Sequence, residues 1–375
     1  MKRMICIFFS WMLAFSMNLT AYAENEMPQG STLCTALVEA QTGMLLRGEQ
    51  SDLPVPAGSQ TKLMTVLLTA QAVESGKLSA EGVIRVPAAA EGAPGATVWL
   101  RTGEEMTLPD LLKAVIIGNA NDAAIALACA VSGTEQGFVA EMNAAAFSLG
   151  LRNTRFADCT GLSPENITTA YELAMLSRAL LRYSRLTPIF TTWRDFLRGE
   201  ETELVSENRL VRSEKGILGM KAGHGEDCGY TLSLAAERGG MQCIAVVLGC
   251  NEADTRFSVG RQLLETGFSQ YSVTTPDFSA EFLRPVTVRH GMSAAVSAES
   301  GALRAAAVPS GESLTCSVIL PEYLEAPVQK GDIIGEIAFY SGDTLLYESP
   351  LTAAEDVPYR GFSETLCLLL GNLFK

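Results

Sequence analysis

The chain of 375 residues has little positive charge and few histidines. It carries 28 lysines and arginines against 42 aspartates and glutamates, so its formal net charge is −14 at pH 7. Nucleic-acid-binding domains present a basic face, and this acidic balance therefore argues against a nucleic-acid partner. The two histidines, His224 and His290, lie far apart in the sequence. They give little support to a Ser-His-Asp catalytic triad.

The nine cysteines do not have the spacing of a metal site. None forms a C-x-x-C pair, and no cluster of histidines accompanies them, so a zinc site is not expected. A fold of this size does not need disulfides for stability, and we expect scattered, buried thiols. No metal or organic cofactor is implied.

The apolar stretch at residues 4–17 is shorter than the ~20 residues that a membrane-spanning helix needs. It follows a positively charged Met-Lys-Arg start and precedes Ala-Tyr-Ala at residues 21–23. These are the three parts of a secretory signal peptide. We therefore predict that residues 1–23 are a signal peptide and that the protein is exported.

Two patterns of secondary structure follow along the chain. Residues 31–274 alternate short strands with amphipathic helices, with turns expected at Thr42-Gly43 and Gly239-Gly240 and a helix break at residues 118–121. From residue 277 to 357 the sequence pattern changes to short strand-like runs separated by Gly, Pro, Asp and Glu. That spacing predicts an α/β domain followed by a small β-sandwich.

The last segment, residues 358–375, predicts an amphipathic helix with one apolar stripe. The stripe consists of Phe362, Leu366, Leu369, Leu370, Leu373 and Phe374. Such a helix is only about 26 Å long, too short in its apolar part to cross a membrane. We expect it to lie in a membrane interface. Docking onto the protein's own surface is the alternative.

The stretch "VPAGSQTKLMTVLLTAQAV", which starts at Val55, places Ser59 and Lys62 three residues apart before an apolar run. If a helix starts at Ser59, the hydroxyl caps its first turn and Lys62 lies on the same face one turn later. Burial and the positive end of the helix dipole both lower a lysine's pKa. A neutral Lys62 amine can take the proton of Ser59 and make it a nucleophile. A helix cap followed by a solvated lysine is the alternative for an isolated match.

Two further motifs follow in order. "IIGNANDAAIALA" places Asn119 and Asn121 at a helix start, and "LGMKAGHGEDCGYTLSLAA" places Lys221, Ala222 and Gly223 at the head of a strand. This series resembles the three motifs of penicillin-binding serine acyl-transferases. The surrounding text, such as "LRTGEEMTLPDLLKAVIIGNANDAAIALA", "LGLRNTRFADCTGL" and "TTAYELAMLSRALL", is similar to the low-molecular-weight serine D-alanyl-D-alanine carboxypeptidases.

The resemblance implies a penicillin-binding or β-lactamase-like domain, with an antiparallel sheet, flanking helices and an all-helical subdomain, followed by the small β-sandwich. It also implies removal of the terminal D-alanine from peptidoglycan stem peptides, and acylation by β-lactams. The place of action would be the outer face of the cytoplasmic membrane or the cell wall.

Carried over residue by residue, the resemblance makes Ser59 the nucleophile and Lys62 its base. Asn121 would hold the substrate backbone. Lys221 would add positive charge near the substrate carboxylate, and Gly223 would leave room for the substrate. The backbone N–H groups of Ser59 and His224 would form the oxyanion hole.

Two residues depart from the family pattern. Asn119 stands where the family usually has a serine thought to relay protons to the leaving D-alanine. Ala222 stands where a threonine or serine hydroxyl usually binds the substrate carboxylate. Each missing hydroxyl removes about 1–3 kcal/mol of hydrogen bonding to a charged group, which lowers the reaction rate about ten- to a hundredfold. We expect a slower or differently selective enzyme. A catalytically idle peptidoglycan-binding homologue is one alternative, and an endopeptidase or β-lactamase on the same scaffold is another.

Four other residues attract attention. Asp122 and Asp158 are expected to brace loops, and Cys228 is expected to be structural. Trp99 is expected either to line a substrate groove or to pack in the core.

Overall fold

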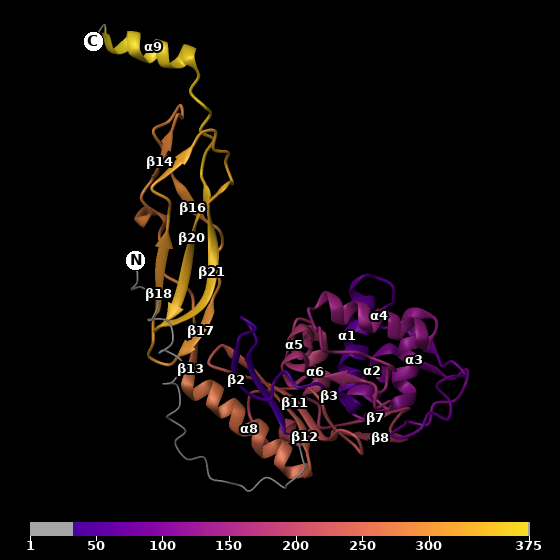
Figure 1. Cartoon of the computed structure of the whole chain (residues 1–375). Coiled ribbons are helices and arrows are strands. Elements are labelled where there is room, and N and C mark those ends of the chain that lie inside the picture. The colour runs from indigo at the N-terminus through magenta and orange to yellow at the C-terminus, as the bar shows by residue number, and fades with distance from the viewer. Residues whose placement is uncertain (1–32, 374–375) are drawn as a thin grey trace, which may run out of the picture.

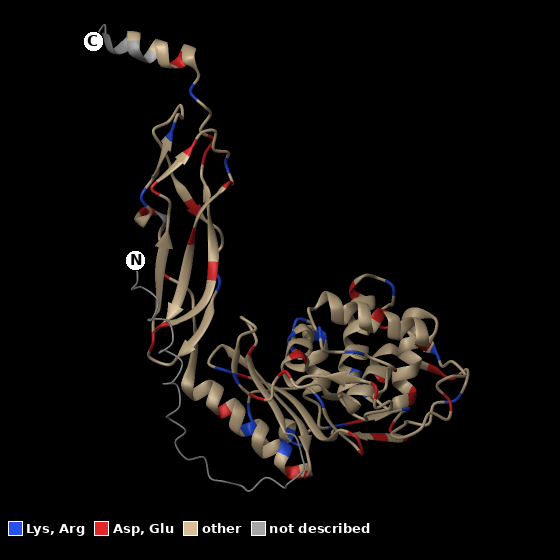
Figure 2. Ribbon diagram, in the orientation of Figure 1, with Lys and Arg blue, Asp and Glu red and all other residues tan. Residues whose placement is uncertain are grey.

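The computed structural model describes residues 33–373, so the predicted signal peptide lies outside the described residues. Figure 1 shows a rounded part that holds most of the helices and an elongated β-rich part that extends away from it. A single helix, α9 (Phe362–Leu373), stands at the far end of the β-rich part. Acidic and basic residues are interspersed along the ribbon in Figure 2.

An antiparallel sheet forms the base of the rounded part. Its strand order is β10-β11-β12-β1-β2, and β9 pairs with β11. The bounds are β1 (Cys34–Glu39), β2 (Leu45–Glu49), β9 (Ile217–Gly219), β10 (Ala222–Gly225), β11 (Gly229–Arg238) and β12 (Met241–Cys250). Each of the two central strands, β11 and β12, has six consecutive buried residues, because helices cover both faces of the sheet. These helices are α5 (Ala170–Leu181) and α8 (Ala253–Gln270).

The predicted turns and the predicted helix break are confirmed. Gly43, Gly239 and Gly240 all have positive φ between the paired strands, a conformation that glycine adopts without steric cost. The break at residues 118–121 separates α2 (Leu108–Ile116) from α3 (Asn121–Ser132).

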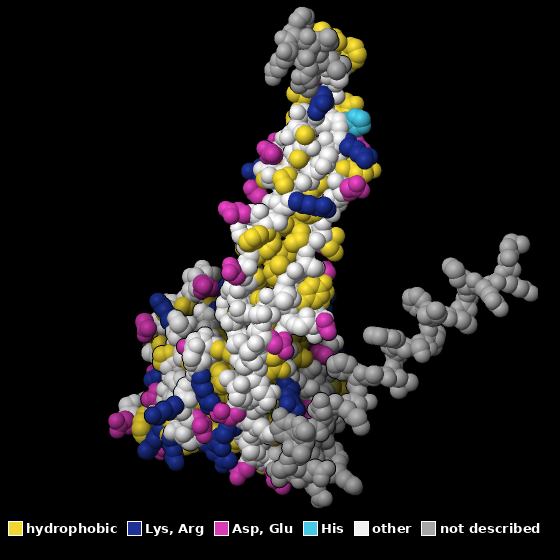
Figure 3. Space-filling model, turned by 90° about the vertical axis from the view of Figure 1, so that its left-hand side faces the viewer, with side chains coloured by type: hydrophobic (Ala, Val, Ile, Leu, Met, Phe, Trp, Pro, Cys, Tyr) yellow, Lys and Arg dark blue, Asp and Glu magenta, His cyan; other side chains and the backbone are white. Residues whose placement is uncertain are grey.

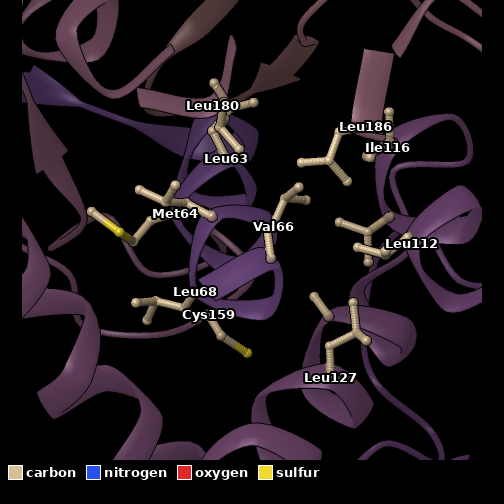
Figure 4. Packing of buried hydrophobic residues seen from close by; sticks show 14 of the residues in the cluster. Leu63, Met64, Val66, Leu68, Leu112, Ile116, Leu127, Cys159, Leu180 and Leu186 are labelled. Carbon is tan, nitrogen blue, oxygen red and sulfur yellow. The ribbon is translucent and has the colours of Figure 1, made fainter. Parts of the chain in front are cut away.

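Helix α1 (Lys62–Glu74) is the centre of the helical part. It packs against α2, α3, α4 (Glu135–Ser148) and α5, and its residues 62–70 are all buried. Figure 4 shows Leu63, Met64, Val66 and Leu68 projecting from α1 toward different neighbours. A helix surrounded in this way is apolar on every side. Any polar residue on it is therefore taken out of water.

Short elements connect these parts. They are β3 (Val55–Pro56), the 3-10 turn η1 (Gly58–Thr61), β4 (Val83–Arg85), β5 (Glu105–Thr107), β6 (Ile167–Thr168), the 3-10 turn η2 (Ser184–Leu186), α6 (Thr187–Phe190), β7 (Arg194–Leu197), β8 (Thr202–Val205) and α7 (Leu210–Ser213).

The β-rich part confirms the predicted strands of the C-terminal region. A three-stranded sheet, β15-β14-β19, and a four-stranded sheet, β16-β21-β20-β18, enclose a core that includes Val288, Ile337, Phe339 and Leu351. The bounds are β14 (Val286–Arg289), β15 (Ala295–Val296), β16 (Ala298–Ser300), β18 (Leu314–Ile319), β19 (Tyr323–Glu325), β20 (Ile333–Ser341) and β21 (Thr344–Ala353), with a 3-10 turn η3 (Ala280–Phe282) before them.

The two parts are joined through a two-stranded ladder. β13 (Tyr271–Thr274) continues from α8 and pairs with β17 (Ala306–Pro309). The Tyr271 hydroxyl donates to the carbonyl of Leu46 (3.0 Å), which ties this ladder to the edge of the large sheet.

The terminal helix is formed as predicted over residues 362–373, and the side chains of Phe362, Leu366 and Leu370 are exposed. Leu369, Leu373 and Phe374 of the predicted stripe lie outside the described side chains. Figure 3 shows hydrophobic side chains beside the grey atoms at this end. Among residues 33–373, no single helix is long and apolar enough to cross a membrane.

The structure differs from the expectations at three points. Ser59 is not a helix cap, because the α-helix begins only at Lys62 and Ser59 lies in the 3-10 turn before it. Trp99 is neither core nor part of the cleft wall, since 76% of it is exposed. The eight cysteines of the described part form no disulfides, as expected, but Cys316 and Cys367 are exposed rather than buried.

Candidate active site

Ser59 and Lys62 line the same cleft, which has a volume of about 380 Å³. Gly58, with φ +50, makes the sharp turn that leads into η1, and Ser59 follows it. Lys62 is the first residue of the central helix, where its side chain is only 1% exposed. Its Nζ donates to the carbonyl oxygen of Thr160 (2.7 Å).

The surroundings of Lys62 favour the neutral amine. Burial, and then repulsion by the charge of Lys221, lower the pKa of Lys62 from 10.5 to about 7, although Cys159, Asp158 and Glu207 act in the opposite direction. A large fraction of the side chain is therefore unprotonated near neutral pH. This is the state that a general base requires.

Lys221 is the second buried lysine of the site. Burial lowers its pKa to about 8, while Glu207 acts to raise it. Its Nζ donates to the carbonyl oxygen of Val115 (3.3 Å) in the last turn of α2. The C-terminal end of a helix carries partial negative charge and stabilises a cation there. Lys221 thus keeps its charge to a higher pH than Lys62.

A tight loop, residues 158–163, supplies the acceptor for Lys62. The carboxylate of Asp158 accepts the backbone N–H groups of Thr160, Gly161 and Ser163. Burial acts to raise the pKa of Asp158, but these hydrogen bonds outweigh it and hold the pKa below its usual value. The loop braces expected at Asp158 and at Asp122, which accepts the N–H groups of Val98 and Leu100, are confirmed.

Asn119 lies on the loop between α2 and α3, and Asn121 is the first residue of α3. Asn119 has φ +57, a region that asparagine tolerates better than most residues, and its Nδ2 donates to Ser59 Oγ (3.2 Å). Asn121 is 4% exposed, and its Nδ2 donates to the carbonyl of Pro94 (2.7 Å). Its Oδ1 is buried and has no partner within the described part of the chain. Other atoms of Asn121 line the cleft.

Strand β10 borders the cleft at the edge of the sheet. The N–H of Ser233 donates to the carbonyl of Lys221 (2.7 Å), so alternate residues of β10 bond to β11. The backbone N–H of His224 therefore faces the open edge, away from β11. The His224 ring stacks on Tyr230 with centroids 4.5 Å apart. His290 is far away on the β-rich part, 3.8 Å from Glu325.

Ala222 and Gly223 do not line the cleft themselves. The Ala222 side chain is buried in the hydrophobic cluster beneath α8, with Leu232 and Phe257. At Gly223 a Cβ atom would come 2.7 Å from Ser59 Cβ, so the missing side chain makes room for the nucleophile. The sequence had suggested room for substrate at this position.

Three contributing residues had no clear signal in the sequence. Buried Gln60 donates through Nε2 to the carbonyl of Lys221 (3.1 Å) and to Thr231 Oγ1 (3.0 Å), which ties η1 to the sheet. Glu207 Oε1 accepts a hydrogen bond from Asn119 Nδ2 (3.2 Å). Arg256, buried at the start of α8, donates to the carbonyl of Gly223. Each contact joins segments distant in sequence.

Cys228 also lines the cleft, but burial raises the pKa of its thiol. The thiol is therefore protonated and a poor nucleophile. Within residues 33–373, no group of three or more His, Cys, Asp or Glu side chains is placed to hold a metal ion.

Comparisons with known proteins agree with this geometry. Residues 22–252 match the D-alanyl-D-alanine carboxypeptidase family, and residues 306–359 match the penicillin-binding protein 5 C-terminal domain family. The D-alanyl-D-alanine carboxypeptidase DacF of Bacillus subtilis is 31% identical over the full length of both chains. Penicillin-binding protein 5 of Haemophilus influenzae has a similar structure (TM-score 0.78, 24% identity, 87% of this chain and 97% of that chain).

A second solved structure, penicillin-binding protein D2 of Listeria monocytogenes in its cefotaxime-bound form, matches with a TM-score of 0.57 and 28% identity, over 63% of this chain and 96% of that chain. The full-length match to a carboxypeptidase and the family match over residues 22–252 cover the strands, the central helix and the cleft. This chain belongs to the serine-type D-alanyl-D-alanine carboxypeptidase family.

Proposed function

We propose that this chain removes the terminal D-alanine from peptidoglycan stem peptides through an acyl ester on Ser59. The observation that carries the proposal is the buried Lys62, with its pKa lowered to about 7, in the same cleft as Ser59. The neutral amine accepts the Ser59 proton as Oγ attacks the carbonyl carbon of the penultimate residue. The C–N bond then breaks, and Lys62 returns the proton to the leaving amine of D-alanine. Water hydrolyses the ester by the reverse proton transfers.

Other residues of the site bind and orient the substrate. The backbone N–H groups of Ser59 and His224 form the oxyanion hole, a role supported by the outward direction of the His224 N–H. Asn121, which lines the cleft, holds the substrate backbone. Lys221 attracts the terminal carboxylate. Asn119 lines the substrate side of the site, whereas Ala222 is buried beneath α8 and Gly223 makes room for Ser59.

The same serine reacts with β-lactams. The support is the likeness, over 63% of this chain, to penicillin-binding protein D2, whose solved structure is a cefotaxime-bound form. Ser59 Oγ attacks the ring carbonyl carbon, the ring C–N bond breaks, and Lys62 passes the serine proton to the ring nitrogen, which stays attached to the acyl group.

We also propose how the chain is arranged around the cell wall. A signal peptide at 1–23 is removed on export, residues 31–274 form the catalytic domain, residues 277–357 form a β-rich spacer, and residues 358–375 rest on the outer face of the cytoplasmic membrane. The exposed side chains of Phe362, Leu366 and Leu370 support the last assignment. Binding of the purified chain to anionic vesicles, with and without residues 358–375, tests it.

One experiment separates the proposed function from its alternatives. The protein is incubated with a fluorescent penicillin, with a stem pentapeptide, with a cross-linked dimer and with a chromogenic cephalosporin. Label on Ser59 and release of free D-alanine support the carboxypeptidase. An unlabelled protein indicates an idle peptidoglycan-binding homologue, and preferential cleavage of the dimer or of the cephalosporin indicates an endopeptidase or a β-lactamase. Ser59→Ala is the control for all four substrates.

A further inference from the structure

The orientation of the Asn119 side-chain amide decides whether Asn119 donates a hydrogen bond to the Ser59 hydroxyl or accepts one from it. A side-chain amide can present either a donor or an acceptor, depending on a half-turn of its terminal group. If the oxygen faced Ser59, the hydroxyl would donate to it and the Ser59 proton would point away from Lys62. With an N–H facing Ser59 Oγ, the hydroxyl proton is left free for the Lys62 amine. The N–H also stabilises negative charge that develops on Oγ.

Glu207 removes this ambiguity. Its Oε1 lies 3.2 Å from Asn119 Nδ2, and the same Nδ2 lies 3.2 Å from Ser59 Oγ. A carboxylate only accepts hydrogen bonds, so it stabilises the amide orientation in which Nδ2 faces it. The half-turned orientation would place Asn119 Oδ1 against the carboxylate, and the two acceptors would repel each other.

The carboxylate is itself held in place. Its second oxygen, Oε2, lies 3.8 Å from Nη2 of Arg256, and Arg256 is buried and donates to the carbonyl of Gly223. A chain of contacts therefore runs from Ser59 through Asn119, Glu207 and Arg256 to β10. Glu207 is 40% exposed and does not line the cleft, so it acts through Asn119 and not on the substrate.

We propose that Glu207 is a positioning residue that fixes the Asn119 amide as a hydrogen-bond donor to Ser59 Oγ. The proposal rests on Ser59 being the acylated nucleophile. In this proposal Asn119 donates a hydrogen bond to Ser59 Oγ and does not relay protons as the family serine is thought to do. The asparagine at position 119 therefore works together with Glu207. A serine hydroxyl at 119 can donate and accept at once, and it would not depend on Glu207 in this way.

The decisive variant is Glu207→Gln, with Glu203→Gln as its control. Glu203 is a glutamate of similar exposure on the neighbouring strand β8, where it pairs with Arg194, and it has the same charge. Glutamine at 207 can donate as well as accept and no longer selects one orientation of Asn119. We expect Glu207→Gln to slow acylation of Ser59 by a fluorescent penicillin about tenfold. Glu203→Gln leaves the rate unchanged.

A second readout distinguishes positioning from a general loss of structure. The titratable groups that act on Lys62 are Lys221, Asp158, Cys159 and Glu207, and Glu207 favours the protonated amine. Removing its charge therefore shifts the acid limb of the pH–rate profile to lower pH. A variant that had only lost structure would slow without this shift.

The same substitution in an Asn119→Ser background completes a double-mutant cycle. In that background we expect Glu207→Gln to slow acylation less than about threefold, because a serine hydroxyl can donate and accept without being held in one orientation by Glu207. The assignment is overturned if Glu207→Gln slows acylation equally in both backgrounds, or if Glu207→Gln acylates as fast as Glu203→Gln. In either case labelling of the wild-type protein at Ser59 still supports the proposed function. A wild-type protein that is not labelled at Ser59 overturns both.

Discussion

Gly223 offers the sharpest test of how the nucleophile is placed. Replacing it by alanine adds one methyl group between β10 and the turn that carries Ser59. On the present backbone the new Cβ would lie 2.7 Å from Ser59 Cβ and 3.3 Å from both Ser59 Oγ and Thr231 Oγ1. Non-bonded carbon atoms are optimally 3.5–4.0 Å apart, so the strand and the turn must separate by about 0.8 Å or more.

That separation cannot be made freely, because Gln60 in the same turn donates to the carbonyl of Lys221 and to Thr231 Oγ1. The turn must either lose these hydrogen bonds or twist Ser59 away from Lys62. A displacement of about 1 Å at a reacting atom can lower the rate about a hundredfold, or about 2.7 kcal/mol in the barrier. Overpacking lowers the free energy of unfolding by about 1–3 kcal/mol.

The assay is the rate constant for acylation by a fluorescent penicillin, measured beside thermal unfolding and D-alanine release. The control is Gly301→Ala, because a Cβ at Gly301 meets open space. We expect Gly223→Ala to remain folded and to acylate about a hundredfold more slowly, and Gly301→Ala to behave as wild type. Acylation of Gly223→Ala at the wild-type rate would refute the claim that this glycine sets the position of Ser59.

Four further outcomes can be measured with the same assays. The acylation rate rises with pH as Lys62 loses its proton near pH 7 and falls as Lys221 loses its charge near pH 8, and a flat profile between these values contradicts the base assignment. Lys221→Met removes the repelling charge, so the acid limb moves to higher pH; a shift to lower pH contradicts this. Asp158→Ala frees three backbone N–H groups, and we expect slower acylation and an unfolding free energy lower by about 1–3 kcal/mol. Asn119→Ser with Ala222→Thr raises D-alanine release, and an unchanged or lower rate means that the present residues have their own working geometry.

The parts of the fold that the sequence predicted are those with local causes. The turns at Gly43 and at Gly239-Gly240 follow from the conformational freedom of glycine, and the hairpins close around them. The break at residues 118–121 follows from the interruption of helical spacing. The motifs of the site were also recognisable in order, because each occupies one short segment.

The contacts that make the motifs work could not be predicted. The acceptor of Lys62 is a carbonyl 98 residues away, that of Lys221 lies 106 residues away, and Glu207 reaches Asn119 across 88 residues. The acceptors of both lysines are backbone carbonyls, which have no signature in the sequence. Glu207 is one of many exposed glutamates, and only the folded chain brings it beside an amide.

The helix cap considered at Ser59 does not form, and the reason bears on the chemistry. A capping hydroxyl accepts a backbone N–H of its own helix and is held there. Because α1 begins only at Lys62, the Ser59 hydroxyl is not used in this way and accepts from Asn119 instead. The 3-10 turn thus separates the start of the helix from the nucleophile. Ser59 Oγ therefore does not act as the N-cap acceptor of α1.

The same arrangement explains why a lysine can serve as base here. A lysine at the first residue of a surface helix would extend into water and stay protonated at neutral pH. Lys62 cannot do so, because α1 is enclosed by four helices and the side chain is 1% exposed. The carbonyl of Thr160 accepts one N–H of the amine, which keeps it oriented without adding a full negative charge. A carboxylate at that place would have restored the ammonium and removed the base.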